Sequence, residues 1–62
     1  MLKVLLVDDE YIVLKGIETM LTKQTKVNLQ IRTACDALEA LGIVSDFFPD
    51  VIIADINMPE LD

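Results

Sequence analysis

The chain has 62 residues, 53% of them hydrophobic, and its 11 acidic and 5 basic side chains give a net charge of −6. A domain of this length buries only about 60% of its unfolded surface, so this apolar content suggests that a partner or a missing remainder of the same chain covers part of it. The basic residues are scattered, which argues against the clustered charge that nucleic acid binding needs. No apolar stretch approaches the roughly 20 residues of a membrane span, and a single cysteine cannot form an intramolecular disulfide. We expect a soluble, cytoplasmic protein, and we expect these 62 residues to contact neither membrane nor nucleic acid.

The first third of the chain predicts a strand and a helix. Residues 2–7 are almost continuously apolar, which is typical of a strand buried on both faces of a parallel sheet. Apolar residues then recur near the 3.6-residue period, which predicts a helix over Tyr11–Thr22. The residues expected on its inward face are Ile12, Leu14, Ile17, Met20 and Leu21.

The remaining sequence predicts two more strands around a second helix. Residues 28–33 alternate between apolar and polar, as in an edge strand with one wetter face. Asp36 and Glu39 have the spacing of a capping box, which predicts a helix from there through Val44. The run 51–54 is wholly apolar, which is typical of a central strand.

The predicted order is β-α-β-α-β, with right-handed crossovers. This order indicates an α/β fold built on a parallel half-sheet of three strands. The loop into the third strand is expected over 46–50, around Pro49, and Cys35 is expected to be a small buried side chain. Gly16, in the middle of the first helix, suggests close packing there.

Acidic residues follow two of the apolar strands. Asp8 and Asp9 come directly after Val7, and Asp55 comes directly after Ala54. The carboxyl ends of parallel strands lie at one edge of such a sheet, where ligands bind, so these carboxylates should meet. Three gathered carboxylates must be exposed to water, share a proton or bind a cation, and we favour the cation. The chain has no histidine, so chemistry at this edge would depend on carboxylates.

Two segments carry a resemblance to a known family. The VDDE segment at 7–10 and the IIADINMPELD segment at 52–62, separated by two crossover units, resemble the amino-terminal half of a response-regulator receiver domain. The resemblance implies a truncated flavodoxin-like, doubly wound fold, in which residues 1–62 are a partial receiver with three strands and two helices. The Asp8–Tyr11 start and the Lys15–Gly16 pair are similar to receivers that precede AraC-type DNA-binding domains.

The resemblance also implies a role for each matching residue. Asp55 matches the phosphoacceptor aspartate, and Asp9 matches the direct acidic ligand of Mg²⁺. Asp8 matches the neighbour that acts through a coordinated water, and the backbone carbonyl of Asn57 matches a further metal ligand. Mg²⁺ favours such oxygen ligands. The implied function is a phosphoacceptor that is not itself an enzyme, with a sensor histidine kinase as partner and a DNA-binding domain elsewhere in a transcriptional regulator.

Each role has a simpler alternative. Asp8 and Asp9 could only cap the first helix, and Asp55 could only form a turn with Asn57. A phosphatase of the haloacid dehalogenase type would need a second aspartate where Asn57 stands. A non-catalytic interaction fragment could instead form a homodimer through an exposed sheet edge. A complete receiver also places a Ser or Thr after strand four and a Lys after strand five, and neither strand is present in these 62 residues.

Overall fold

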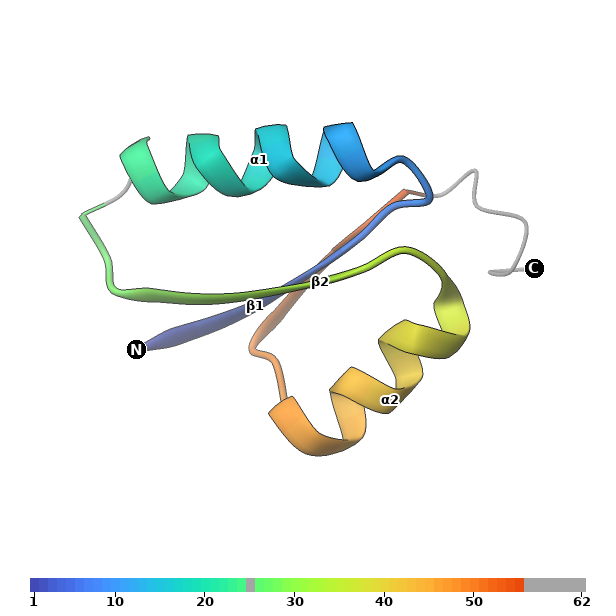
Figure 1. The fold of residues 1–62 in the computed structure, drawn as a ribbon. Coiled ribbons are helices and arrows are strands. Elements are labelled where there is room, and N and C mark those ends of the chain that lie inside the picture. Colours follow the sequence, from blue (N-terminus) through green and yellow to red (C-terminus); the bar gives the residue numbers. More distant parts are fainter. Residues whose placement is uncertain (25, 56–62) are drawn as a thin grey trace.

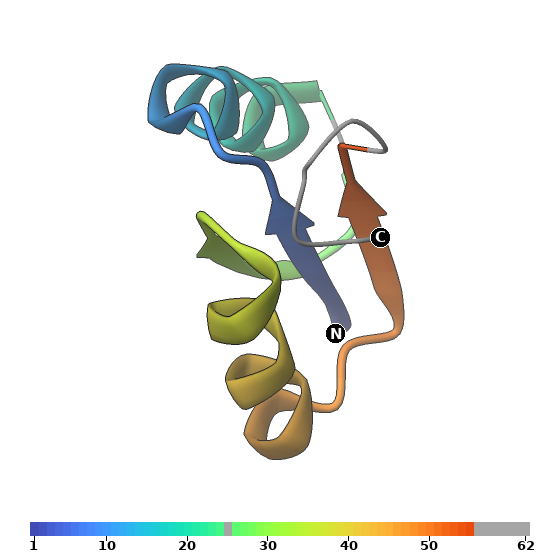
Figure 2. The ribbon, with the colours of Figure 1, turned by 90° about the vertical axis from the view of Figure 1, so that its right-hand side faces the viewer.

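The computed structural model describes residues 1–24 and 26–55. Five elements follow in the predicted order. They are β1 (Leu2–Val7), α1 (Tyr11–Gln24), β2 (Leu29–Ala34), α2 (Ala37–Phe47) and β3 (Val51–Ala54). The three strands form one parallel sheet in the order β2-β1-β3, and the two helices lie on opposite faces of it (Figures 1 and 2). The predicted parallel α/β half-sheet is therefore confirmed.

The core lies on both faces of β1. Strand alternation sends Val4 and Leu6 toward α1, where they pack with the buried Leu14. Leu5 and Val7 point the other way and pack with Ala34 under α2. The continuous apolar run of β1 is thus explained by its central position, where both faces are covered.

Hydrogen bonds at both ends of α2 explain its limits. The Asp36 carboxylate accepts a hydrogen bond from the Glu39 backbone N–H at 2.7 Å, and the Glu39 carboxylate accepts one from the Cys35 N–H at 2.7 Å. This reciprocal pair is the predicted capping box. At the other end, Phe48 adopts a left-handed conformation with φ 52° and donates its N–H to the Val44 carbonyl.

Two sequence predictions on helix ends need correction. α1 continues to Gln24, and α2 continues through Phe47, so the loop before β3 is shorter than 46–50. β3 is an edge strand of the described sheet, and all its side chains are exposed. Within the described residues, β3 pairs only with β1.

Some side chains also lie in places the sequence did not suggest. Cys35 is exposed rather than buried. Ile12 and Met20 belong to the outer side of α1, where they are 84% and 54% exposed. A Cβ added at Gly16 would meet no atom within 4 Å, so close packing does not explain this glycine. Within the described residues, neither helix has the length and apolar character needed to cross a membrane.

Candidate functional site

The strand ends bring two acidic segments to one edge of the sheet. The Asp8 backbone N–H donates to the Ala34 carbonyl at 3.1 Å, and the Asp55 N–H donates to the Val7 carbonyl at 3.0 Å. Strand-like hydrogen bonding therefore continues one residue beyond each strand. These hydrogen bonds hold the backbone of Asp8 and Asp55 in place independently of their side chains.

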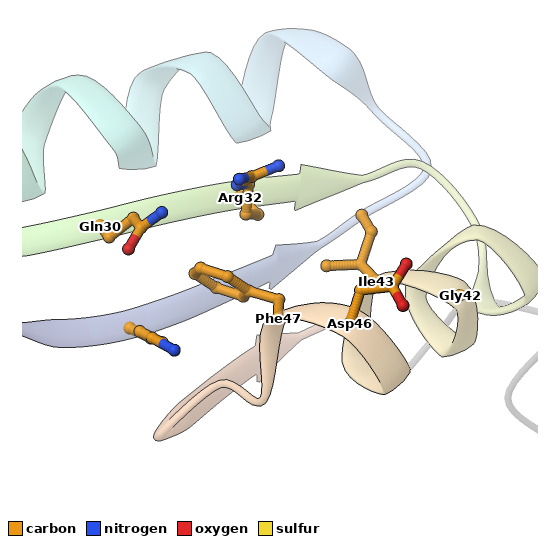
Figure 3. A pocket seen from close by; sticks show the side chains of 7 residues that line it. Gln30, Arg32, Gly42, Ile43, Asp46 and Phe47 are labelled. Carbon is orange, nitrogen blue, oxygen red and sulfur yellow. The ribbon is translucent and has the colours of Figure 1, made fainter.

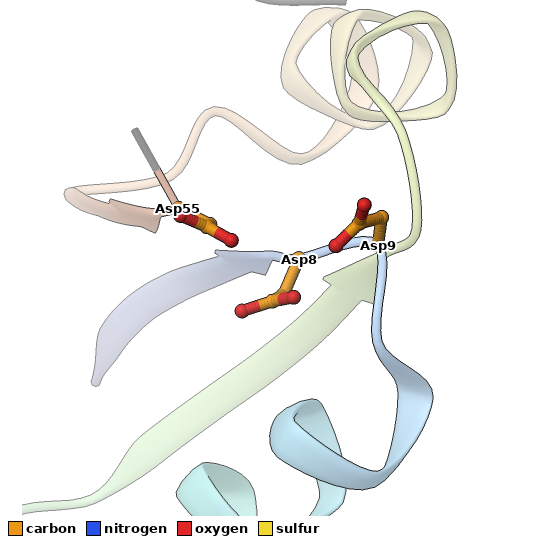
Figure 4. Close-up of side chains that lie close together, drawn as sticks. All are labelled: Asp8, Asp9 and Asp55. Carbon is orange, nitrogen blue, oxygen red and sulfur yellow. The ribbon is translucent and has the colours of Figure 1, made fainter. Parts of the chain in front are cut away.

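The carboxylates of Asp8, Asp9 and Asp55 form one cluster. Each contributes an oxygen, and these oxygens all lie within 4.8 Å of one another. Asp8 and Asp55 are half-buried, whereas Asp9 is exposed. Figure 4 shows Asp8 and Asp9 on the segment that leaves β1, with Asp55 reaching toward them from the end of β3. The predicted convergence of these three residues is present in the structure.

The turn between β1 and α1 holds the first two acids. One Asp8 carboxylate oxygen accepts a hydrogen bond from the Glu10 backbone N–H at 2.9 Å. The Glu10 carbonyl accepts from the N–H groups of Val13 and Leu14 at 3.1 and 3.2 Å, so Glu10 begins the hydrogen bonding of α1. Glu10 therefore lies at the start of the helix, and the Asp8 side chain stabilises the turn before it.

The cluster fits a hard divalent cation. Mg²⁺ takes octahedral oxygen ligands at about 2.1 Å, which places opposite ligands about 4.2 Å apart. Neighbouring ligands of the same ion are about 3 Å apart. The three carboxylate oxygens lie within 4.8 Å of one another, so side-chain rotations could bring them around one ion. Because Asp9 is exposed, water can reach the remaining positions, which suits an ion that keeps several waters.

Asn57, the fourth predicted ligand, lies outside the described residues. A hollow of about 320 Å³ adjoins the acids, between Asp8 and Asp55 and the apolar Leu14 and Ile53. The described acids could be predicted from the sequence, because Asp8 and Asp55 directly follow apolar strands and Asp9 is next to Asp8. Sequence reasoning did not find a second hollow on the α2 face, whose residues come from three elements and have no contiguous motif.

Comparison with known proteins gives a consistent family. Residues 4–62 match the family described as the response regulator receiver domain. Over the whole chain, the sequence is 40% identical to a protein-glutamate methylesterase/protein-glutamine glutaminase of Methanospirillum hungatei, of which it covers 17%. Over 98% of the chain, it is 39% identical to Protein PilG of Pseudomonas aeruginosa and 31% identical to the transcriptional regulatory protein YhcZ of Bacillus subtilis, covering 43% and 28% of them.

The chain therefore spans less than half the length of each of these relatives. No solved structure matches it. The family match extends over 4–62 and so includes both acidic segments, whose side chains meet at one edge of a parallel sheet. On these grounds, the chain belongs to the response regulator receiver domain family.

Proposed function

We propose that this chain accepts a phosphoryl group on Asp55, in a site that Asp8 and Asp9 complete by holding Mg²⁺. The observation that carries the proposal is the meeting of three carboxylates from two separate strand ends. Family membership supports a phosphoacceptor role in a two-component phosphorelay. The assignment of individual residues rests on their positions at the strand ends and on the oxygen-only donor set.

The proposed step is a phosphoryl transfer to a carboxylate. An Asp55 oxygen attacks the phosphorus atom of the donor, an O–P bond forms, and the bond to the donor's leaving atom breaks with its electron pair. When bound, Mg²⁺ would neutralise part of the charge that otherwise repels an anionic nucleophile from a phosphoryl group. Asp8 and Asp9 would hold that ion, and the hydrogen bond from Glu10 would keep Asp8 in place.

The product would change the charge at the end of β3. An aspartyl phosphate adds roughly one further negative charge and new acceptor oxygens. A change of this kind can shift the balance between two conformations of neighbouring segments. We propose that the segment receives a signal in this way and is not itself a turnover enzyme.

The proposal extends to the partner and the parent protein. A sensor histidine kinase in the cytoplasm would be the phosphodonor, and residues 1–62 would be part of a receiver in a transcriptional regulator. YhcZ is described as a transcriptional regulatory protein, and the Methanospirillum hungatei relative as a methylesterase. Receivers of this family thus occur in proteins with different outputs, and a DNA-binding output is the one we propose here.

Intact mass spectrometry tests the acceptor. A protein carrying the complete receiver is incubated with MgCl₂ and a small phosphodonor such as acetyl phosphate. We expect the mass of one added phosphoryl group in the wild type and none in Asp55→Asn. Glu18→Gln serves as a control, because Glu18 pairs with Lys15 on α1 and belongs to neither the acidic cluster nor the α2-face hollow, so it should leave the adduct unchanged. An adduct that persists in Asp55→Asn would assign the acceptor elsewhere.

A second candidate is an interaction segment that forms a homodimer through its sheet edge. The exposed apolar side chains of β3 favour it. This candidate needs no phosphorylation, so a measurement of association state separates it from the phosphoacceptor.

A further inference from the structure

A second hollow lies on the α2 face of the sheet, toward the amino-terminal ends of β1 and β2. It has a volume of about 480 Å³, and its lining includes Lys3, Gln30, Arg32, Asp46 and Phe47. Figure 3 shows the Phe47 ring projecting from α2 toward the strands, with Gln30 and Arg32 beside it on β2. All of these residues come from β1, β2 and α2, whereas the acidic cluster lies beyond the carboxyl ends of β1 and β3.

Strand register explains why two cations meet here. Lys3 is paired with Gln30, and Leu5 is paired with Arg32. Lys3 and Leu5 are two residues apart, so they share the face that α2 covers, and their partners on β2 share it too. Phe47, which is only 7% exposed, lines the hollow with Lys3 and Arg32. The Lys3 ammonium lies 5.7 Å from the ring centroid and the Arg32 guanidinium 5.2 Å.

Within the part of the chain that the structure describes, neither cation has a carboxylate partner, although the protein is acidic. Across residues 1–24 and 26–55, the one ion pair is Lys15–Glu18, at 3.5 Å. There the Glu18 carboxylate first, and Tyr11 second, raise the pKa of Lys15 above its usual 10.5. Lys3 and Arg32 instead contact the aromatic ring, although the chain carries a net charge of −6.

The described negative groups near the hollow do not neutralise Lys3 and Arg32 by ion pairing. Asp50 is already engaged, because its carboxylate accepts a hydrogen bond from the Lys3 backbone N–H at 2.9 Å. The carboxyl end of α2 has partial negative charge that favours nearby cations. Asp46 is the one full negative charge in the lining, and it forms no ion pair with the described cations. It would compete with an external anion for the same positive groups.

We propose that this hollow binds a small oxyanion, either a phosphate or a carboxylate group. Arg32 offers a planar fork of donors that matches both groups. Lys3 adds a second positive charge and Gln30 an amide donor, while the Phe47 ring holds the two cations beside the hollow. The site is separate from the acidic cluster and does not depend on Asp55 being phosphorylated.

An NMR titration of the ¹⁵N-labelled chain tests the site. Inorganic phosphate is added at constant ionic strength against sodium chloride, and acetate forms a second arm that tells a phosphate site from a carboxylate site. We expect saturable shifts at the amides of Lys3, Gln30, Arg32 and Phe47 in at least one arm. Arg32→Gln should weaken binding about tenfold, because it removes a charge-assisted hydrogen bond.

Two further variants keep the test decisive. Asp46→Asn removes the competing charge and should strengthen binding about two- to fivefold. Lys23→Gln, an exposed lysine in the last turn of α1, should leave it unchanged. Shifts that do not saturate would overturn the proposal. A Lys23→Gln variant that weakens binding as much as Arg32→Gln does would overturn it too. So would an Arg32→Gln protein that loses stability but binds as the wild type does, since the cations would then only cover Phe47.

Discussion

Asp9 is the most exposed member of the acidic cluster, although its carboxylate lies within 4.8 Å of both others. Two carboxylates about 4 Å apart repel by roughly 1 to 4 kcal/mol, depending on the local dielectric. The fold accepts this repulsion because backbone hydrogen bonds at Asp8 and Asp55 fix the strand ends. Folding without a cation should therefore be less favourable at this site than folding with one.

Thermal unfolding with and without magnesium tests this balance. At ten times its dissociation constant, a ligand of the folded state adds about 1.4 kcal/mol of stability, or roughly 6 to 11 °C in a domain of this size. We expect MgCl₂ to raise the Tm of the wild type. Asp9→Asn should raise the Tm without magnesium, because it removes a repelling charge, and it should reduce the response to the ion.

Sodium chloride at matched ionic strength is the control for this measurement, since salt alone screens surface charge. Asp46→Asn is the matched variant, because Asp46 is an exposed aspartate outside the acidic cluster. An equal magnesium response in Asp9→Asn and the wild type would remove Asp9 from the proposed ligands.

The acids could be predicted from sequence because their placement follows from strand direction alone. Asp8 and Asp55 are the first residues after apolar strands, and parallel strands end at one edge. The exposure of Cys35 and Ile12 could not be predicted in the same way. It depends on which part of each neighbouring element lies above the residue, and both side chains are exposed in the structure.

At the level of elements, helix starts were more predictable than helix ends. The start of α2 has a local signature, since Asp36 and Glu39 bond to backbone N–H groups within the same turn. Its end depends on Phe48 in a left-handed conformation. Glycine or asparagine usually occupies that position, so a phenylalanine gives no signal of a helix end. The predicted helix therefore stopped short of Phe47.

Asp36→Ala measures how much the capping box contributes. Losing an N-cap side chain typically costs about 1 kcal/mol, within a range of 0.5 to 2. We expect a fall of that size in the free energy of unfolding in urea, because the Glu39 N–H loses its acceptor. Glu39→Gln keeps an acceptor oxygen for the Cys35 N–H and should have a smaller effect. Equal stability of Asp36→Ala and the wild type would show that the first turn of α2 does not need its cap.

For the molecule as a whole, the strand order decides which apolar surface is covered. With the order β2-β1-β3, both helices cover β1, and β3 extends beyond them. A hollow of about 320 Å³ between α2 and β3 is lined by Ile52 and Leu41, among other apolar residues. The sequence predicted three parallel strands and allowed for an exposed sheet edge. It could not assign that edge to β3, because the apolar run 51–54 has the composition of a buried strand.

The β3 edge should make the 62-residue chain associate at high concentration. Val51, Ile52 and Ile53 are 39 to 53% exposed, and an apolar edge strand can pair with another chain. In an antiparallel pair, the acidic clusters of two copies would lie at opposite ends of the shared edge. Salt should strengthen the association by screening the repulsion between two chains of charge −6.

Sedimentation equilibrium over a range of protein and salt concentrations measures this association. Ile52→Lys should weaken it, because a lysine on an edge strand opposes pairing, and Ile52 does not line the acidic hollow. Ile12→Lys is the matched control, since Ile12 is an isoleucine on α1 that is 84% exposed. If Ile12→Lys reduced association as much as Ile52→Lys, the contact would involve α1 rather than the β3 edge. A chain that stays monomeric at high concentration and high salt would rule out the homodimer, while leaving the phosphoacceptor role of Asp55 to its own test.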